Sequence, residues 1–220
     1  MTTRIYGPPV EAFPPSGHNL GFTASGLNGG FGGVPYAAAL APTAACTWLW
    51  RAKSVDPSGY NGVGAVLLSQ WDTAGALGRL ICYRNVTDDS QIVLGHSNTG
   101  GDVISCTVYT NAGVWTEGVE HELGFVYDGA GVGNAGRAKL YFDGALPVQN
   151  HFGTWPAALS NPSAPTNIGN KRGSAASYVP FQGYVYDVRL YDVALSAAQI
   201  TLAYGNPTDV TLPAPTARWI

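Results

Sequence analysis

Short stretches in which apolar and polar residues alternate recur along the middle of the chain. The strongest cover residues 46–52, 104–109, 121–127 and 138–142. In the first of them Trp48 and Trp50 fall on one side and the intervening residues on the other. Strict alternation is typical of β-strands that place one face on a core. Because pairs such as Asp143-Gly144 supply tight turns between such strands, the pattern predicts an antiparallel β-sandwich.

Residues 184–191 also alternate and are expected to form a strand near the C-terminus. With an uninterrupted period of two, one face carries Val185, Asp187, Arg189 and Tyr191, and the other carries Tyr184, Tyr186, Val188 and Leu190. Asp187 and Arg189 are then neighbours on one face. Since a charge on a covered sheet face needs a partner, we expect these two side chains to form a structural ion pair.

One short helix is predicted after this strand. Ser196 is placed to cap it, and Gln199 three residues later completes a capping box. Gly205 supplies a stop, and Pro207 prevents continuation. Strands do not alternate with long helices elsewhere in the sequence, which argues against a parallel α/β fold. The fold class expected is therefore all-β, with one short C-terminal helix.

The 220 residues fit a single domain with two Pro-containing ends. We expect residues 1–20 to form an extended arm, residues 21–206 the sandwich, and residues 207–220 a C-terminal tail. The ends carry large apolar residues whose exposure to solvent would be unfavourable, namely Tyr6, Phe13, Trp219 and Ile220. Two interpretations stay open: the ends pack back on the sandwich, or they contact a neighbouring molecule.

Composition excludes several classes of partner. Charged residues make up 11% of the chain and the formal net charge is −3, with no cluster of Lys and Arg, so a nucleic-acid interface is not expected. No apolar run reaches the roughly 20 residues of a membrane helix. The N-terminal residues lack the apolar region of a secretory signal. We therefore expect synthesis in the cytoplasm, with release by lysis or a dedicated export route if the protein acts outside the cell.

Three cysteines, Cys46, Cys82 and Cys106, lie within apolar strand-like stretches. An odd number allows at most one disulfide within the chain. We interpret all three as buried thiols that pack as small apolar residues, with a disulfide as the alternative.

The segment from Phe181 to Pro207, FQGYVYDVRLYDVALSAAQITLAYGNP, resembles the closing segment of laminin G-like, concanavalin A-like jelly rolls. That segment reads F-x-G-x-I-D-x-V-R-I-Y-x-x-A-L-S-x-x-E-I and is followed by a short helix. Upstream, HELGFVYDG and AKLYFDGAL are similar to the family's paired strands that end in "YDG" and "YVDG". The resemblance covers roughly residues 21–206 and implies a sandwich whose rim or faces hold ligands.

Many members of this family bind Ca²⁺ at the rim of the sandwich through Asp, Asn and carbonyl oxygens. The adjacent pair Asp88 and Asp89 is the best candidate here, and further loop candidates are Asp72, Asn98, Asp102 and Asn134. Members that bind sugars stack the rings on loop or concave-face aromatics. The corresponding candidates are Trp71, Trp115, Trp155 and Tyr178, whose alternative role is to cover the core.

Glycosidases of this fold use paired carboxylates on one strand face. Glu120 and Glu122 share a face, but no acidic residue lies between them, so we interpret them as a solvated strand face. The four histidines show no metal-ligand spacing. The sequence thus predicts a module that is not an enzyme.

The function expected first is a virion surface protein, such as a phage capsid-decoration or tail-associated domain that contacts neighbouring copies or other particle proteins. It rests on a lone domain of low charge flanked by Pro-rich ends. The alternative is a Ca²⁺-dependent carbohydrate-binding lectin module, and the two roles are compatible. A glycoside hydrolase is a remote third hypothesis, based on fold analogy alone.

Overall fold

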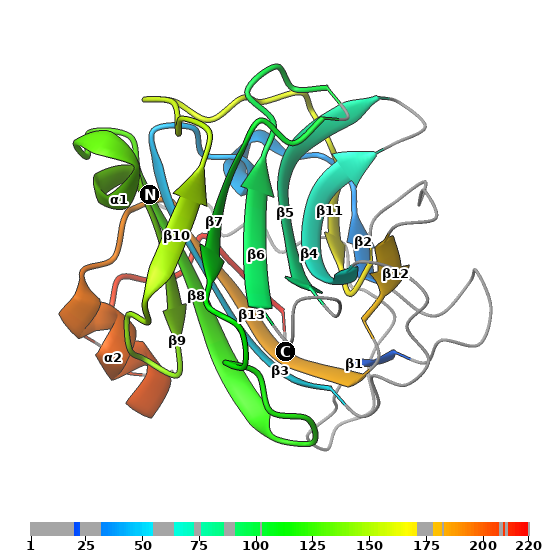
Figure 1. Cartoon of the computed structure of the whole chain (residues 1–220), viewed down its shortest axis with the longest axis vertical. Helices are drawn as coiled ribbons and strands as arrows, with labels where there is room; N and C mark the ends of the chain where they lie inside the picture. Colours follow the sequence, from blue (N-terminus) through cyan, green and yellow to red (C-terminus); the bar gives the residue numbers. More distant parts are fainter. Residues whose placement is uncertain are drawn as a thin grey trace.

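The computed structural model describes residues 20–22, 32–54, 64–72, 76–85, 91–101, 103–170, 178–181, 183–206, 209 and 211–219. Two sheets pack face to face (Figure 1). The six-stranded sheet contains, in spatial order, β1 (Leu20–Phe22), β13 (Gly183–Tyr191), β3 (Ala45–Ser54), β8 (Glu120–Asp128) and β9 (Ala138–Phe142), with β14 (Ala217–Trp219) also paired to β13. The arrangement is the all-β sandwich that the alternating pattern predicted.

The eight-stranded sheet forms the other layer. Its spatial order is β10 (Gln149–Phe152), β7 (Cys106–Thr110), β6 (Gln91–His96), β5 (Leu77–Asn85), β4 (Gly64–Asp72), β11 (Thr166–Ile168) and β2 (Gly32–Val34), and β12 (Tyr178–Pro180) pairs with β4. The pairing of β12 with β4 is parallel, and the other strand pairs are antiparallel. The helical segments are η1 (Ala38–Leu40), α1 (Gly133–Arg137) and α2 (Ala197–Gly205).

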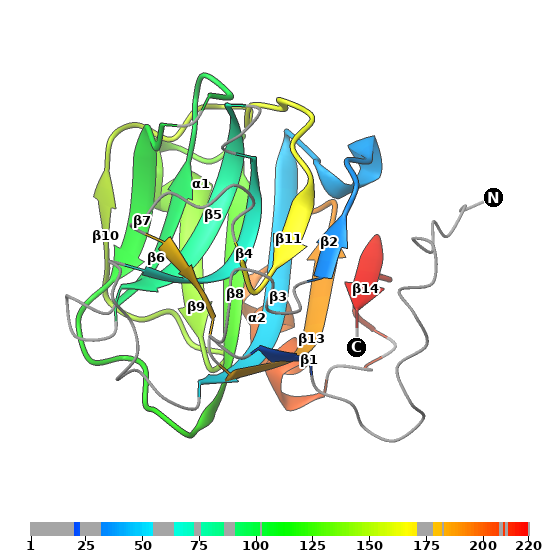
Figure 2. The same ribbon diagram turned by 90° about the vertical axis from the view of Figure 1, so that its right-hand side faces the viewer.

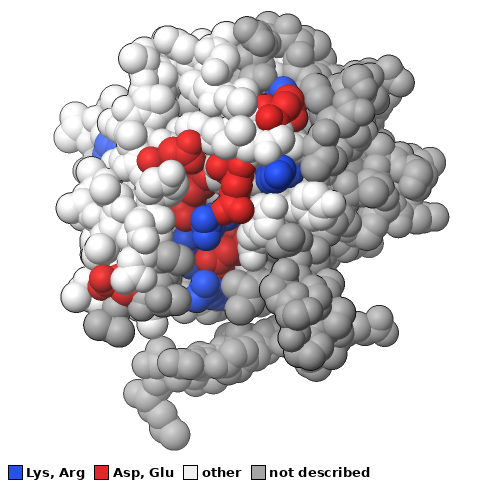
Figure 3. Space-filling view, turned by 90° about the horizontal axis from the view of Figure 1, so that it is seen from below, with Lys and Arg blue, Asp and Glu red and all other residues white. Residues whose placement is uncertain are grey.

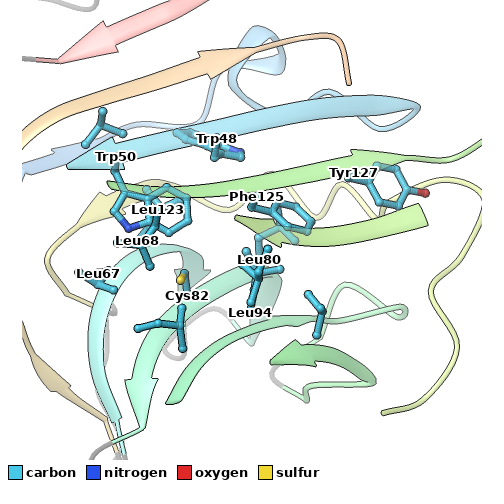
Figure 4. Close-up of a cluster of buried hydrophobic side chains, with 14 of the residues drawn as sticks. Trp48, Trp50, Leu67, Leu68, Leu80, Cys82, Leu94, Leu123, Phe125 and Tyr127 are labelled. Carbon is cyan, nitrogen blue, oxygen red and sulfur yellow. The ribbon is translucent and has the colours of Figure 1, made fainter. Parts of the chain in front are cut away.

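The main hydrophobic core lies between the two sheets (Figure 4). Trp48 and Trp50 of β3 face Leu80 of β5, and Leu123 and Phe125 of β8 lie beside them. These side chains alternate with outward-facing neighbours along each strand, as a period of two requires. Core apolar groups contribute roughly 25 cal/mol per Å² removed from water, so this layer dominates the stability of the fold.

Strand β13 departs from the regular alternation expected for it. The register with β3 shifts between Val185 and Asp187, which places an extra residue, Tyr186, in a β-bulge. As a result Val185, Val188 and Leu190 all point into the main core. The predicted assignment of residues to the two faces of β13 was therefore wrong for Tyr184 and Val185, which precede the bulge. It was correct for the residues from Asp187 to Tyr191, which follow it.

The ion pair predicted on this strand is confirmed. Arg189 Nε lies 3.1 Å from Asp187 Oδ2, and both side chains are buried. Asp187 also accepts two hydrogen bonds from Arg218, at 2.9 and 3.1 Å. The carboxylate therefore joins β13 to β14.

Helix α2 begins and is capped as predicted. The Ser196 hydroxyl accepts a hydrogen bond from Gln199 N, and the Gln199 side chain accepts one from Ser196 N. Ile200 and Ala203 belong to a second apolar cluster with Leu49. Since Leu49 alternates with Trp48 and Trp50, this helix covers part of the outer face of the six-stranded sheet.

The three cysteines are free and buried, which confirms their interpretation as packing residues. Burial raises the pKa of Cys46 to about 11, because the thiolate loses its hydration, although Arg79 acts in the opposite direction. The thiols are therefore held in their neutral form.

The end of the chain returns to the sandwich. Strand β14 pairs with β13 (Figure 2), and the Trp219 ring stacks on Trp48 at a centroid distance of 6.1 Å and an interplanar angle of 9°. Of the predicted assembly residues, Tyr6, Phe13 and Ile220 lie outside the described residues. Among the residues that are described, no helix has the length and apolar character needed to cross a membrane.

Candidate functional site

A row of side chains crosses the outer face of the eight-stranded sheet. Cys82 and Val108 point into the core, so the residues next to them, Tyr83 and Tyr109, point outward. The strand registers align Val66, Tyr83, Val93, Tyr109 and Asn150 across β4, β5, β6, β7 and β10. The two tyrosines are separated by one strand, which sets their backbones about 10 Å apart.

The adjacent row contributes a third aromatic ring. It aligns Ser69, Ile81, Gly95, Thr107 and Phe152 across the same five strands. Phe152 is 66% exposed, whereas Tyr83 and Tyr109 are half-buried. We call Tyr83, Val93, Tyr109, Asn150 and Phe152 the aromatic face. Neither of the two rows contains a charged residue.

Amide side chains accompany these rings. Asn150 Nδ2 donates a hydrogen bond to Asn111 Oδ1 at 3.1 Å, and both side chains are exposed. At the other end of the tyrosines, Asn85 and Gln91 oppose each other in the register of β5 and β6. Each amide offers both donors and acceptors.

Aromatic rings next to amides form a surface suited to neutral, hydroxyl-rich ligands. A flat ring packs against apolar C–H groups and needs no charge on its ligand. Amides hydrogen-bond to hydroxyls in either direction. The arrangement can therefore bind a ring that is apolar on one side and rich in hydroxyls at its edge.

The outer face of the six-stranded sheet is different, because it carries an ion network. Glu122 contacts Arg189 at 3.1 Å, Arg189 contacts Asp187, and Arg51 contacts Glu120. Seen from below, acidic and basic side chains stand side by side in the middle of the molecule (Figure 3). The opposite charges pair with one another within the sheet.

Glu122 is buried, so its interpretation as part of a solvated face was wrong; Glu120 is exposed. Burial raises the pKa of Glu122 to about 7, although the nearby Arg189 and Arg51 favour the charged form. Both carboxylates are engaged by arginines, which is the arrangement of a structural network.

His121 lies between these two glutamates in sequence but points into the sandwich. Its Nδ1 lies 2.8 Å from Asp143 Oδ2, and its Nε2 accepts a hydrogen bond from Thr116 N at 3.2 Å. The ring is buried against Trp115 and Phe142. Because both ring nitrogens are engaged, the side chain anchors a loop to the turn after β9.

Of the aromatic residues predicted to bind sugar, Trp71 is buried on the outer face of the eight-stranded sheet, where it packs with Val66 and Ile81 beside Tyr83. Trp115 and Trp155 are buried in the main core, which is the alternative role given to them. The side chain of Tyr178 lies outside the described residues, although its strand β12 pairs with β4. The signal for Tyr83 and Tyr109 was present in the sequence, because each of them follows a core residue within a strand.

The proposed Ca²⁺ ligands Asp88, Asp89 and Asp102 lie outside the described residues. Asn134 accepts a hydrogen bond from Trp155 N and donates one to Gly153 O, which makes it a loop-fixing residue. Over the described part of the chain, no group of three or more His, Cys, Asp or Glu side chains is placed to hold a metal ion.

Two sheets, antiparallel except for the β12–β4 pair, pack around one apolar core and define a β-sandwich. A family model described as the concanavalin A-like lectin/glucanases superfamily matches residues 55–201. The chain belongs to this superfamily, as the resemblance of its closing segment implied. A comparison with curated proteins finds no match.

Several solved structures share the fold. The CBM40 domain of Ruminococcus gnavus IT-sialidase, bound to α2,3-sialyllactose, has 17% identity and a TM-score of 0.57, covering 79% of this chain and 93% of that one. Domain 4 of AbnA, a GH43 extracellular arabinanase from Geobacillus stearothermophilus, in complex with arabinotriose, has 16% identity and a TM-score of 0.50, covering 77% and 69%.

A leech intramolecular trans-sialidase has 22% identity and a TM-score of 0.53, with 80% of this chain covered. The match spans only 26% of the leech enzyme. These similarities show a shared fold.

Proposed function

We propose that this chain is a non-catalytic glycan-binding module and that the sugar lies on the aromatic face. The observation that carries this proposal is the alignment of Tyr83, Tyr109 and Phe152 on an uncharged sheet surface beside the Asn111–Asn150 pair. A largely exposed phenylalanine is unfavourable in water, and a sugar ring packed against it removes that apolar surface from solvent.

The comparisons support a carbohydrate ligand. The CBM40 domain was solved with α2,3-sialyllactose and the arabinanase domain with arabinotriose, and both share the sandwich of this chain. The identities of these sugars do not transfer at such low sequence identity. The proposal therefore takes from them only the ligand class.

The state of the acidic residues favours binding over hydrolysis. A retaining glycosidase needs two carboxyl groups about 5 Å apart that are free to reach the substrate. Glu122 is buried and paired with Arg189, and Glu120 is paired with Arg51. Freeing either carboxylate for catalysis would require breaking its ion pair with an arginine.

Decoration of a virion or another particle stays a prediction, as do the domain boundaries and the localisation. Trp219, which we expected to contact either the sandwich or a neighbour, packs on Trp48 of its own chain. This packing does not support a tail that contacts a neighbouring molecule.

The test is a glycan array probed with the full chain, followed by calorimetric titration of the sugar that binds most strongly. We expect Tyr109→Ala and Tyr83→Ala to weaken binding. The matched control is Tyr184→Ala, since Tyr184 is 38% exposed on a strand of the six-stranded sheet. An array without signal, or equal losses for Tyr109→Ala and Tyr184→Ala, would contradict the proposal. Repeating the titration with EDTA tests the Ca²⁺ hypothesis separately.

A further inference from the structure

Strand β10 ends the eight-stranded sheet with one side open. Within the described part of the chain β7 is its only pairing partner. Figure 1 shows β10 at the left-hand margin of the front sheet, with no strand beyond it. Unpaired N–H and C=O groups at such an edge form a template on which another strand can pair.

The hydrogen bonds identify which backbone groups face outward. Asn111 N donates to Val148 O at 3.4 Å, and Asn150 pairs with Tyr109. In an antiparallel ladder the direction of the backbone groups alternates from one residue to the next. The N–H and C=O groups of Gln149 and His151 therefore point away from β7, toward the open side.

The terminal strand of the other sheet, β9, is protected in a way that β10 is not. Leu140 N of β9 donates to the Gln149 side chain at 2.9 Å, and Lys139 adds a charge to that strand. Natural edge strands are commonly blunted by lysine, proline or bulges. Residues 149–152 contain no lysine and no proline, and no charged residue occurs from 144 to 170. Nothing in this edge repels an identical edge.

The open edge also exposes large apolar side chains. Val148, immediately before β10, is 71% exposed, and Phe152 at its other end is 66% exposed. Both lie on the outer side of the sheet, since they have the parity of Asn150. Exposed apolar side chains gathered on one edge are typical of an interaction surface.

We propose that β10 pairs antiparallel with the β10 of a second copy of this chain, about a twofold axis at Asn150. In this register Gln149 lies opposite the partner's His151, so the outward-facing backbone groups exchange hydrogen bonds. Val148 then lies opposite the partner's Phe152. A twofold interface must be self-complementary, and this register places the two exposed apolar side chains of one copy on those of the other.

The pairing joins two aromatic faces into one surface. Tyr109 and Asn150 of both copies come to lie on the same side of a continuous sheet, so a dimer presents two binding faces to one glycan-coated surface. This consequence rests on the proposed function, whereas the pairing itself does not. The paired segment is short and buries less than the roughly 1,200–2,000 Å² of stable interfaces, so a weak, concentration-dependent dimer is expected.

Charge-exchange variants followed by sedimentation velocity test the register. The full chain is expected to shift from monomer to dimer as its concentration rises, and Val148→Lys and Phe152→Glu are each expected to remain monomeric. An equimolar mixture of the two variants should recover dimers, because the new lysine lies opposite the new glutamate of the other chain. Val132→Lys, at a side chain that is 92% exposed elsewhere, should leave the wild-type dimer unchanged.

A covalent test uses Asn150→Cys. Opposing residues in a non-hydrogen-bonded antiparallel pair have Cα atoms about 4.5 Å apart, which a disulfide can span. Oxidation should link two chains through the introduced thiols, since the three native cysteines are buried. Val132→Cys is the control that should not cross-link. A monomeric wild type up to about 1 mM, or a mixture of variants that stays monomeric, overturns the proposal whatever the glycan array shows.

Discussion

The outer faces of the two sheets differ in the kinds of side chain that they carry. On the six-stranded sheet, helix α2 covers one part and an ion network that includes Glu122 and Arg189 occupies another. On the eight-stranded sheet, Tyr83 and Tyr109 lie on a surface whose two central rows carry no charge. On the first face the charged groups pair with one another, whereas the second face exposes the uncharged ring of Phe152.

This difference indicates which outer face of the sandwich is the better candidate for a ligand site. A buried charge costs several kcal/mol unless it is paired, so the arginines and carboxylates of the first face are constrained to one another. The Phe152 ring on the second face is 66% exposed and carries no charge that has to be paired. Charged residues on a sheet face are therefore a weaker indication of a ligand site here than uncharged aromatic ones.

The largest expected effect comes from breaking the ion network. Arg189→Leu removes the nearer arginine from the buried Glu122 and leaves only Arg51 at 4.0 Å, and we expect a loss of about 3–5 kcal/mol in the free energy of unfolding at pH 8. The control is Glu120→Gln, which breaks the half-exposed pair with Arg51 and leaves both arginines beside Glu122; it should cost below about 1 kcal/mol. Urea denaturation measures both. Equal losses would show that the network is not a buried structural unit.

The next largest expected effect is the pH dependence of the free energy of unfolding that Glu122 causes. Its pKa of about 7 in the folded state lies above the 4.5 of the free side chain. The folded state thus binds more protons between these values, and the stability that this group contributes is full below about pH 4.5 and lost as the pH rises through 7. The change amounts to at most about 3 kcal/mol.

Denaturation of wild type and Glu122→Gln at pH 5 and pH 8 isolates this effect. We expect the wild type to lose more stability than the variant over this interval. The comparison between the two proteins is needed because burial lowers the pKa of His96 to about 4, and this group favours stability at the higher pH. An identical pH dependence in both proteins contradicts the role given to Glu122.

On the aromatic face, the contribution of the Tyr109 ring to glycan binding can be separated from the contribution of its hydroxyl. Tyr109→Ala should weaken glycan binding by about tenfold or more, because it removes the stacking surface. Tyr109→Phe keeps the ring and should stay within about threefold of wild type. Calorimetric titration measures both, with thermal denaturation as a check on folding. A loss as large for phenylalanine as for alanine would point to a hydroxyl contact instead.

The smallest effect is expected at the amides. Asn111→Ala removes the acceptor of the Asn150 side chain and should reduce affinity by only a few-fold, the cost of one net hydrogen bond of about 1 kcal/mol. Asn161→Ala, at an exposed amide that donates to the Tyr36 hydroxyl, serves as the control. An effect of Asn111→Ala larger than that of Tyr109→Ala would reverse the order of importance given to rings and amides.

The sequence predicts those features of the fold that depend on periodicity. Alternation placed Trp48 and Trp50 on one face of a strand, the face that lies in the core, and local spacing gave the capping box at Ser196. The bulge at Tyr186 could not be found, because it arises from pairing with β3 and leaves no mark in the residue pattern.

The site was harder to predict than the fold. Trp71 and Trp155 lie beside turn signals in the sequence and were therefore candidates for sugar-binding residues in loops. Both are buried instead, because burying a large apolar side chain is favourable. Tyr109 was assigned to a strand, yet alternation alone does not say whether an outward tyrosine is covered by other segments. Only the alignment across β5, β6, β7 and β10 shows that these rings form one surface.

The most direct test of the glycan-binding face is a titration of isotope-labelled protein with the sugar selected on the array, followed by nuclear magnetic resonance. The account predicts that the backbone amide shifts move for Tyr83, Val93, Tyr109 and Phe152, while those of Glu122 and Arg189 stay in place. Shifts confined to the six-stranded sheet would contradict it.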